Sequence, residues 1–230
     1  ELGGNFRIAA YPTGKGQLTE AIRSMIVKCQ QAGVDLRCGV EAEEMLLRSL
    51  APDAIILATG STPLILPIPG LSDCGYVTAQ DMLDGKAQMG KNVLVVGGGM
   101  VGCEAAEYLA ERGHQVAVIE MKDVIAADVT PENRRYMFEN FEENHVLLRP
   151  GAKVTQFYAD SVDCALVDGS TGSLRGYDNI VLAMGSRSNT ALKDTAEKVA
   201  GQVLVIGEAA KAPGNAVLAT GDALEAALKI

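Results

Sequence analysis

The stretch VLVVGGGMVGCE at 93–104 restricts the possible folds of this chain more than any other part of the sequence. It begins as an apolar run of strand length, continues through Gly97, Gly99 and Gly102 in the spacing G-x-G-x-x-G, and passes into a helical pattern. In such a unit the first glycine allows a tight turn, the second lets a ligand approach the backbone, and the third lets the helix pack on the strand. We therefore predict a strand–turn–helix unit of the Rossmann type.

The same unit predicts a nucleotide site. Gly98, Met100 and Val101 complete the turn, where free backbone N–H groups and the helix dipole attract an anionic pyrophosphate. Glu120 ends the next predicted strand about 20 residues further on, where its carboxylate can accept hydrogen bonds from ribose hydroxyls and repel a 2′-phosphate. We therefore expect NAD(H) to bind in preference to NADP(H). The alternatives are a glycine turn without a ligand and a Glu120 that only faces solvent.

Other candidate residues for chemistry are few. Glu104 lies in the first turn of the predicted helix and is a further candidate for contacting the nucleotide, although the helix dipole favours an acid there without any function. The two histidines, His114 and His145, have no partners that would form a catalytic triad or a metal site. We therefore expect no acid–base or nucleophilic catalytic residue and no metal site in this chain.

Composition argues against several classes of protein. A net charge of −9 without a basic stripe argues against nucleic-acid binding. The five cysteines form no CxxC pair, which predicts reduced, buried thiols rather than disulfides, a zinc site or an iron–sulfur cluster. No long apolar run or signal-peptide pattern occurs, so we expect no membrane association and a cytoplasmic location. The chain begins with Glu1 rather than Met, which suggests a processed chain or part of a longer one.

Hydrophobic periodicity predicts alternating helices and strands. Helices are expected at 17–31, 41–49, 101–112 and 131–144 and at the C-terminal end, and strands at 34–38, 54–60, 92–97, 116–120, 145–149, 179–185 and 203–208. Thr130 before Pro131 predicts a helix N-cap. The stretch 153–178, with turns at Asp168-Gly169 and Thr171-Gly172, predicts a small antiparallel meander. This order is typical of an α/β protein with buried parallel sheets.

Two segments of the chain repeat one pattern. DAIILATGSTP at 53–63 and DNIVLAMGSRSN at 178–189 both contain an aspartate, an apolar strand, a glycine and a serine. Two unrelated hydrophobic strands would explain the apolar runs but not the matched Gly-Ser exits. We interpret the pair as two strands that cross between two intertwined domains.

The motifs LGG at 2–4, ATGSTP at 58–63, VVGGGMVGCEAAEYLAERG at 95–113 and LAMGSRSN at 182–189 occur in a familiar order. Together they resemble the flavin and pyridine-nucleotide module of the NADH:flavin oxidoreductases. The resemblance is to the C-terminal part of the 2,4-dienoyl-CoA reductase, trimethylamine dehydrogenase and NADH oxidase group, and it covers essentially the whole chain. It implies a Rossmann-type three-layer FAD/NAD(P)-binding fold, in which a nucleotide domain is inserted in a partial FAD-type domain.

The resemblance also implies domain boundaries and flavin-side residues. The implied segments are 1–64 and 186–230 for the partial FAD-type domain, 65–90 for a connection, and 91–185 for the NAD(H)-binding domain. Ala58, Thr59 and Gly60 match the family's turn beside the flavin pyrophosphate and ribityl chain. Gly185 matches the loop that faces NAD(P)H. Glu208 stands where the family usually has an aspartate that contacts the flavin, so the charge is kept on a longer side chain.

The cofactors and activity follow from the same resemblance. In the family an N-terminal barrel similar to Old Yellow Enzyme carries FMN and an iron–sulfur cluster, and the FAD-type domain opens with its own glycine-rich strand–turn–helix before LGG. This sequence contains neither part, so we expect NADH binding here but no FAD binding by the chain alone, although the parent protein would use FAD. The implied function is the NADH-binding portion of a flavin-dependent oxidoreductase, inactive in isolation, with the barrel of the same polypeptide as its partner.

Two other functions compete with this one. A non-catalytic nucleotide-binding module, with a regulatory or electron-input role, is the alternative. A disulfide reductase is disfavoured because the sequence contains no redox-active cysteine pair.

Overall fold

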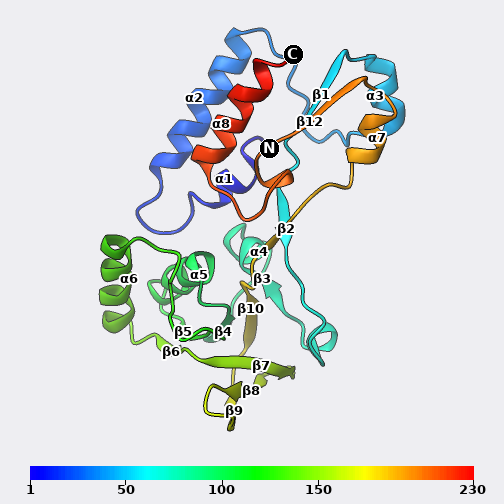
Figure 1. Cartoon of the computed structure of the whole chain (residues 1–230). Coiled ribbons are helices and arrows are strands. Elements are labelled where there is room, and N and C mark those ends of the chain that lie inside the picture. The colour runs from blue at the N-terminus through cyan, green and yellow to red at the C-terminus, as the bar shows by residue number, and fades with distance from the viewer. The chain divides into compact units, whose positions relative to one another are not determined.

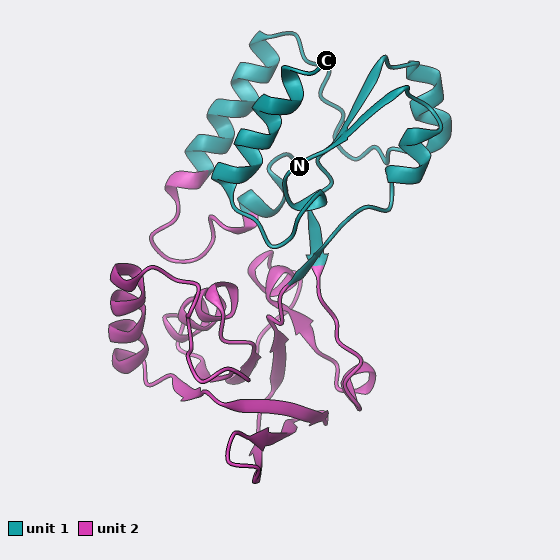
Figure 2. Ribbon diagram, in the orientation of Figure 1, with its two compact units in different colours: residues 1–7, 19–62, 186–230 teal, residues 8–18, 63–185 magenta.

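The computed structural model describes residues 1–230, and contacts within it divide the chain into two compact units (Figure 2). Unit 1 comprises residues 1–7, 19–62 and 186–230, and unit 2 comprises residues 8–18 and 63–185. The chain therefore passes between the units at four places, after Arg7, Leu18, Thr62 and Gly185. No helix of either unit is long and apolar enough to span a membrane.

Unit 2 is built on a five-stranded parallel sheet (Figure 1). Its strands, in spatial order, are β3 (Val77–Thr78), β10 (Asn179–Leu182), β4 (Asn92–Val96), β5 (Gln115–Ile119) and β6 (Leu147–Arg149). The predicted strands at 92–97, 116–120, 145–149 and 179–185 are thus confirmed, within one to three residues at their ends. After a polar first residue, the central strands β4 and β5 are apolar and buried because both faces of the sheet are covered.

The alternation of side chains along β4 separates two cores. Val93 and Val95 pack with the helices α4 (Ala79–Leu83), α5 (Met100–Ala110) and α6 (Pro131–Glu143). Leu94 and Val96 point to the other face and pack with Phe157 and other residues of the meander. Because successive strand residues face opposite sides, one strand joins both layers. Unit 2 is therefore a three-layer arrangement of helices, parallel sheet and antiparallel strands.

The meander of the third layer consists of β7 (Ala152–Phe157), β8 (Ser161–Leu166) and β9 (Thr171–Arg175). The predicted turn at Asp168-Gly169 is confirmed, with Gly169 at a φ of +83° and the Asp168 carboxylate accepting the Ser170 N–H at 2.9 Å. The predicted turn at Thr171-Gly172 is wrong. These two residues open β9 and pair with β8, since the chain has already reversed at Gly169.

Unit 1 contains a two-stranded parallel sheet of β1 (Ala54–Leu57) and β12 (Gln202–Val205). Ile55 and Leu57 of β1 pack with Ala196 and Ala200 around α7 (Lys193–Glu197), and Leu47 of α3 (Glu44–Leu50) packs against this cluster. The remaining helical elements of the chain are α1 (Gly4–Ile8), α2 (Gln17–Gln31), η1 (Leu71–Asp73), η2 (Gly207–Ala209) and α8 (Ala216–Ala227). Helix α2 has the bounds predicted for it, and α8 is the expected C-terminal helix, capped by the Asn215 side chain.

The strand predicted at 34–38 is wrong, because no residue of that stretch lies in a strand. A strand needs a neighbour to receive its backbone hydrogen bonds, and this stretch pairs with neither β1 nor β12. The Thr130 prediction is also only half right. Thr130 occupies the N-cap position of α6, but its side chain makes no capping hydrogen bond.

The Gly-Ser segments that end the two repeated patterns lead into strands that pair with each other. Strand β2 (Ser61–Pro63) and strand β11 (Ser186–Ser188) form a small sheet, and both follow a glycine with positive φ, +69° at Gly60 and +101° at Gly185. The chain passes between the units within β2, after Thr62, and directly before β11, after Gly185. The interpretation of the repeat as two crossing strands is therefore confirmed. Residues 65–90, expected as a connection, contain η1, β3 and α4.

Candidate functional site

The glycine turn of unit 2 joins β4 to α5 at the carboxyl edge of the parallel sheet. Gly97 has a φ of +111°, donates its N–H to Ile119 O at 2.9 Å, and lies so near Ala183 that an added Cβ would overlap the Ala183 carbonyl oxygen. Gly102, buried in the first turn of α5, lies so near Gly97 O that a Cβ would overlap it too. The protein's own packing therefore requires both of these glycines.

Gly99 is required for neither backbone nor packing reasons. Its φ of −76° and ψ of −177° are extended backbone that any residue adopts. An added Cβ would meet only the Asp128 carboxylate, with Oδ2 at 3.3 Å. The close approach of a ligand such as a pyrophosphate to this backbone stays a prediction. Met100 and Val101, the first residues of α5, are 40% and 47% exposed, so this side of the turn is open.

Glu120 directly follows β5 and is anchored to the turn. Its side chain is buried, and Oε2 accepts the Gly98 N–H at 2.6 Å while Oε1 accepts the Lys122 N–H at 2.9 Å. Each carboxylate oxygen can accept a second hydrogen bond, so these contacts leave capacity for ribose hydroxyls. The structure thus brings Glu120 and the glycine turn together, as the sequence predicted, while its role toward a nucleotide stays a prediction.

Asp128 was not among the predicted site residues. Its Oδ1 accepts the Met100 N–H at 2.9 Å, which places a carboxylate at the start of α5. It comes from the irregular stretch 121–130 between β5 and α6, where no periodic pattern marks a residue. Only its distance of a few residues from Glu120 could have drawn attention to it.

Glu104 is engaged within the protein. Its carboxylate forms an ion pair with Lys15 Nζ, and Thr13 from the same segment donates to Glu111. Half-buried Glu107 lies between these two acids on α5, and burial, followed by the charges of Glu111 and Glu104, raises its pKa to about 7. No sequence pattern marks Lys15, because it lies 89 positions before Glu104 in the chain.

The cysteines of the chain are all free thiols. Burial raises the pKa of Cys103 to about 12, with a smaller contribution from the Asp128 charge, so this thiol beside the glycine turn is unreactive. Cys74 and Cys164 are also buried. The prediction of burial is wrong for exposed Cys38, which lies in the stretch without a strand partner, and for half-exposed Cys29.

The flavin-side candidates lie together in unit 1. Ala58, Thr59 and Gly60 follow β1, and Glu208 lies in η2 at the end of β12. Glu208 Oε2 accepts the Ser61 hydroxyl at 2.8 Å and the Asn5 amide at 3.4 Å, while Oε1 accepts the Gly214 N–H at 3.0 Å.

These contacts form one polar edge beside the turn at Gly60. Unit 1 has no second strand–glycine turn–helix like that at Gly97. A contact of these residues with a flavin stays a prediction.

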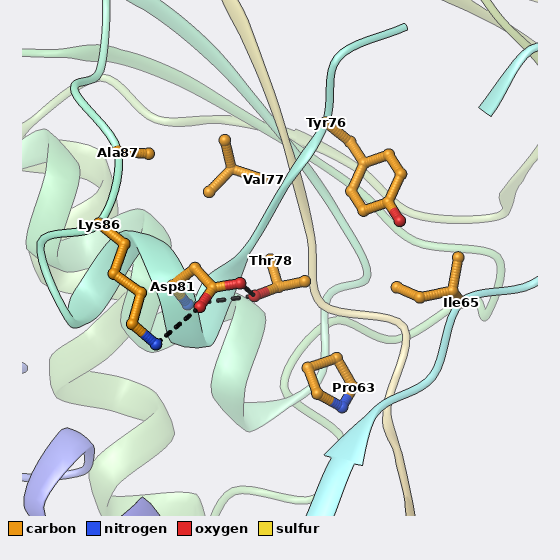
Figure 3. Close-up of a pocket in the computed structure, with 8 residues that line it drawn as sticks. All are labelled: Pro63, Ile65, Tyr76, Val77, Thr78, Asp81, Lys86 and Ala87. Carbon is orange, nitrogen blue, oxygen red and sulfur yellow. Dashed lines mark hydrogen bonds and ion pairs between the residues drawn. The ribbon is translucent and has the colours of Figure 1, made fainter. Parts of the chain in front are cut away.

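A surface hollow of unit 2 lies at β3 and α4, and its lining includes no residue of the glycine turn (Figure 3). Its charged groups, Asp81 and Lys86, are paired with each other. Thr78 caps α4 and donates to Asp81 at 2.8 Å, and Lys86 Nζ lies 3.1 Å from the other oxygen of Asp81. The hydrogen bond from Thr78, helped by Lys86, holds the pKa of Asp81 below its usual value. These bonds fix the end of the helix, so the hollow has no free charged group to bind a ligand.

Comparison with known proteins matches nearly the whole chain to one family. Residues 17–228 match the family described as pyridine nucleotide-disulphide oxidoreductase. The chain is 35% identical to bilirubin reductase of Mediterraneibacter gnavus and 37% identical to NADH oxidase of Thermoanaerobacter brockii, in each case over 90% of the chain. It spans about a third of the length of these curated relatives, 32% and 33%.

Solved structures agree with this match. The structure of a 2-naphthoyl-CoA reductase superposes on 100% of the chain with a TM-score of 0.94 and 26% identity, and the match covers 35% of that protein. Histamine dehydrogenase from Rhizobium sp. 4-9 has the same fold over 100% of the chain, with a TM-score of 0.87 and 18% identity. The fold and the resemblance predicted from the sequence motifs are thus confirmed.

Proposed function

The chain belongs to the pyridine nucleotide-disulphide oxidoreductase family, and from this membership we propose that it is the NADH-binding portion of a flavin-dependent oxidoreductase. In the proposed parent enzyme a hydride passes from NADH to FAD, and electrons continue to iron–sulfur and FMN groups in a barrel domain of the same polypeptide. The relatives' names, NADH oxidase and bilirubin reductase among them, support an oxidoreductase role for the whole protein.

The observation that carries the proposal is the exposed side of the turn at Gly99. Gly97 and Gly102 are explained by backbone packing, whereas Gly99 has an ordinary backbone and an added Cβ would press only on the exposed Asp128 carboxylate, with Oδ2 at 3.3 Å. A pyrophosphate resting on the turn would require this glycine and would be held by backbone N–H groups at the start of α5. Glu120, fixed by two backbone N–H groups, would accept the ribose hydroxyls.

The other residues of this chain would bind and orient rather than react. Gly185 lies beyond the end of β10, the strand beside β4, so it would border the same edge of the sheet. Ala58, Thr59, Gly60 and Glu208 would contact one edge of the flavin. The hydride chemistry itself belongs to the cofactors, which is why no acid–base or nucleophilic residue is needed here.

Titration of the purified chain with NADH, followed by nucleotide fluorescence or calorimetry, tests the proposal. We expect saturable one-to-one binding that Gly99→Val abolishes. A melting curve of the variant is the folding control, because an unfolded variant would also lose NADH binding. A folded Gly99→Val protein that binds NADH as tightly as the wild type would place the nucleotide elsewhere.

One alternative is a nucleotide-binding module with a regulatory or electron-input role and no turnover. The parent protein distinguishes the two functions. A parent that contains flavin and oxidises NADH is the enzyme proposed here. A parent that binds NADH but passes no electrons to flavin or to artificial acceptors is the module.

A further inference from the structure

The geometry points to Asp128 as a residue that sets how tightly the glycine turn holds a dinucleotide, an inference that rests on the nucleotide site proposed above. Asp128 Oδ1 accepts the N–H of Met100 at 2.9 Å, and Met100 is the first residue of α5. Oδ2 lies 3.3 Å from the position of an added Cβ at Gly99. The carboxylate therefore occupies the same open side of the turn that explains the glycine.

A carboxylate and a pyrophosphate are competing ligands for this N–H group. Both are anionic acceptors, and both are favoured at the start of a helix by the dipole and the free backbone donors. Met100 has a single N–H, so the hydrogen bond to Asp128 must be given up before a phosphate oxygen can take it. Asp128 thus holds an N–H group that a pyrophosphate oxygen would take.

The backbone around Asp128 keeps the charge near the turn even if the side chain rotates away. Ala126 donates its N–H to Gly98 O at 2.7 Å, and it is buried with a φ of +54°. Arg134 Nε donates to Ile125 O at 3.1 Å. A non-glycine residue in the left-handed region persists only where its surroundings hold it firmly. A bound dinucleotide would therefore still face the charge of Asp128.

Asp128 differs in this respect from Glu120. Both oxygens of Glu120 are bonded to backbone N–H groups and its side chain is buried, whereas Asp128 is exposed and can be displaced. Glu120 is placed to recognise the ribose, and Asp128 is placed to oppose the pyrophosphate. The expected effect of Asp128 is weaker binding and faster release of any ligand that contains a pyrophosphate.

The test compares Asp128→Asn with Asp123→Asn in the full chain. Asparagine caps helices about as well as aspartate, so the first variant keeps the turn but loses the charge. Asp123 is exposed in the same stretch and makes no hydrogen bond to the glycine turn, so the second variant controls for net charge. Each protein is titrated with NADH, with ADP-ribose and with adenosine, which lacks phosphate.

We expect Asp128→Asn to bind NADH and ADP-ribose about two- to tenfold more tightly than the wild type, with adenosine affinity unchanged. Asp123→Asn should match the wild type for all three ligands. Added salt should reduce the difference between Asp128→Asn and the wild type, because it screens the charge. A purely structural role for Asp128 would change adenosine and ADP-ribose affinity alike.

Two failures can be told apart. If the wild type binds NADH and Asp128→Asn binds it equally or more weakly, the inference about Asp128 is wrong and the proposed site stands. If neither the wild type nor Asp128→Asn binds NADH or ADP-ribose, while both have normal melting curves, the proposed nucleotide site is wrong and the inference falls with it.

Discussion

The carboxylate of Glu120 accepts the backbone N–H of Gly98 at 2.6 Å, so the acid expected to select NADH also helps to hold the glycine turn. The second oxygen accepts the N–H of Lys122 at 2.9 Å. A substitution at Glu120 therefore changes the shape of the turn as well as its charge. A variant without a hydrogen-bond acceptor at this position therefore weakens the turn in addition to changing the charge.

We predict that the wild-type chain binds NADH at least severalfold more tightly than NADPH, because Glu120 repels the 2′-phosphate. Glu120→Gln keeps one acceptor oxygen and should narrow the difference between the two Kd values. Glu120→Arg should shift preference toward NADPH but weaken binding overall, since it leaves Gly98 and Lys122 without their acceptor. Titration of both nucleotides measures this, and equal wild-type affinities would refute the role of Glu120.

Substitution should lower stability at Gly102 and abolish NADH binding at Gly99. Gly102→Ala should lower the free energy of unfolding by about 1–3 kcal/mol, because its Cβ overlaps Gly97 O in a packed interior. Gly99→Val should leave the melting temperature close to that of the wild type and remove NADH binding. Thermal melts combined with NADH titrations separate the two effects. Equal loss of stability in both variants would contradict our account of Gly99.

We predict that the chain purifies colourless and shows no NADH-dependent dye reduction even with added FAD. Glu208 and Ser61 would offer a flavin one polar edge, but unit 1 contains no strand–glycine turn–helix like that at Gly97 to hold the pyrophosphate of FAD. Part of a site rarely holds a ligand against the entropy that the ligand loses on binding. Absorbance in the flavin bands after gel filtration with excess FAD measures this. Stoichiometric bound flavin would show that unit 1 is sufficient.

Glu107 should make stability depend on pH. Its pKa rises from 4.5 to about 7 in the folded chain, so the folded state binds a proton more tightly than the unfolded state. The resulting stabilisation is fully present below about pH 4.5 and is lost as the pH rises through 7. Glu107→Gln should therefore be more stable than the wild type at pH 8, by about 1 kcal/mol once solvent screening of this half-buried group is allowed for.

Chemical denaturation of the wild type and of Glu107→Gln at intervals from pH 5 to pH 8 tests this. The difference between the two proteins should grow across that range. Glu143→Gln, the same substitution at an exposed position of α6, is the matched control. A constant difference between Glu107→Gln and the wild type would mean that Glu107 does not titrate in this window.

The sequence predicted the glycine turn and most of the parallel strands because their signals are local. A strand, three glycines and a helix lie within 93–104, and the buried strands are continuous apolar runs. Strand β3 was missed because its two residues are too few to show a period. The stretch 34–38 is expected as a strand because its residues favour one, but pairing decides the outcome, and this stretch pairs with no strand.

The contacts of the candidate site were harder to predict than its position. Glu120 was found because a spacing rule connects it to the turn. Asp128 and Lys15 follow no such rule, since an irregular segment brings each of them to α5. Their positions depend on tertiary structure that only the folded chain specifies.

The pairing of β1 with β12 has a consequence for the order of folding. Ala54 lies beside Gln202, and nearly the whole of unit 2 is encoded between them. During synthesis β12, the partner of β1, is made only after unit 2. Closing so long a loop of unfolded chain is entropically costly and slow. If unit 2 folds first, it shortens that loop to a compact body. The folding of unit 2 would then bring β1 and β12 close enough to pair and so allow unit 1 to fold.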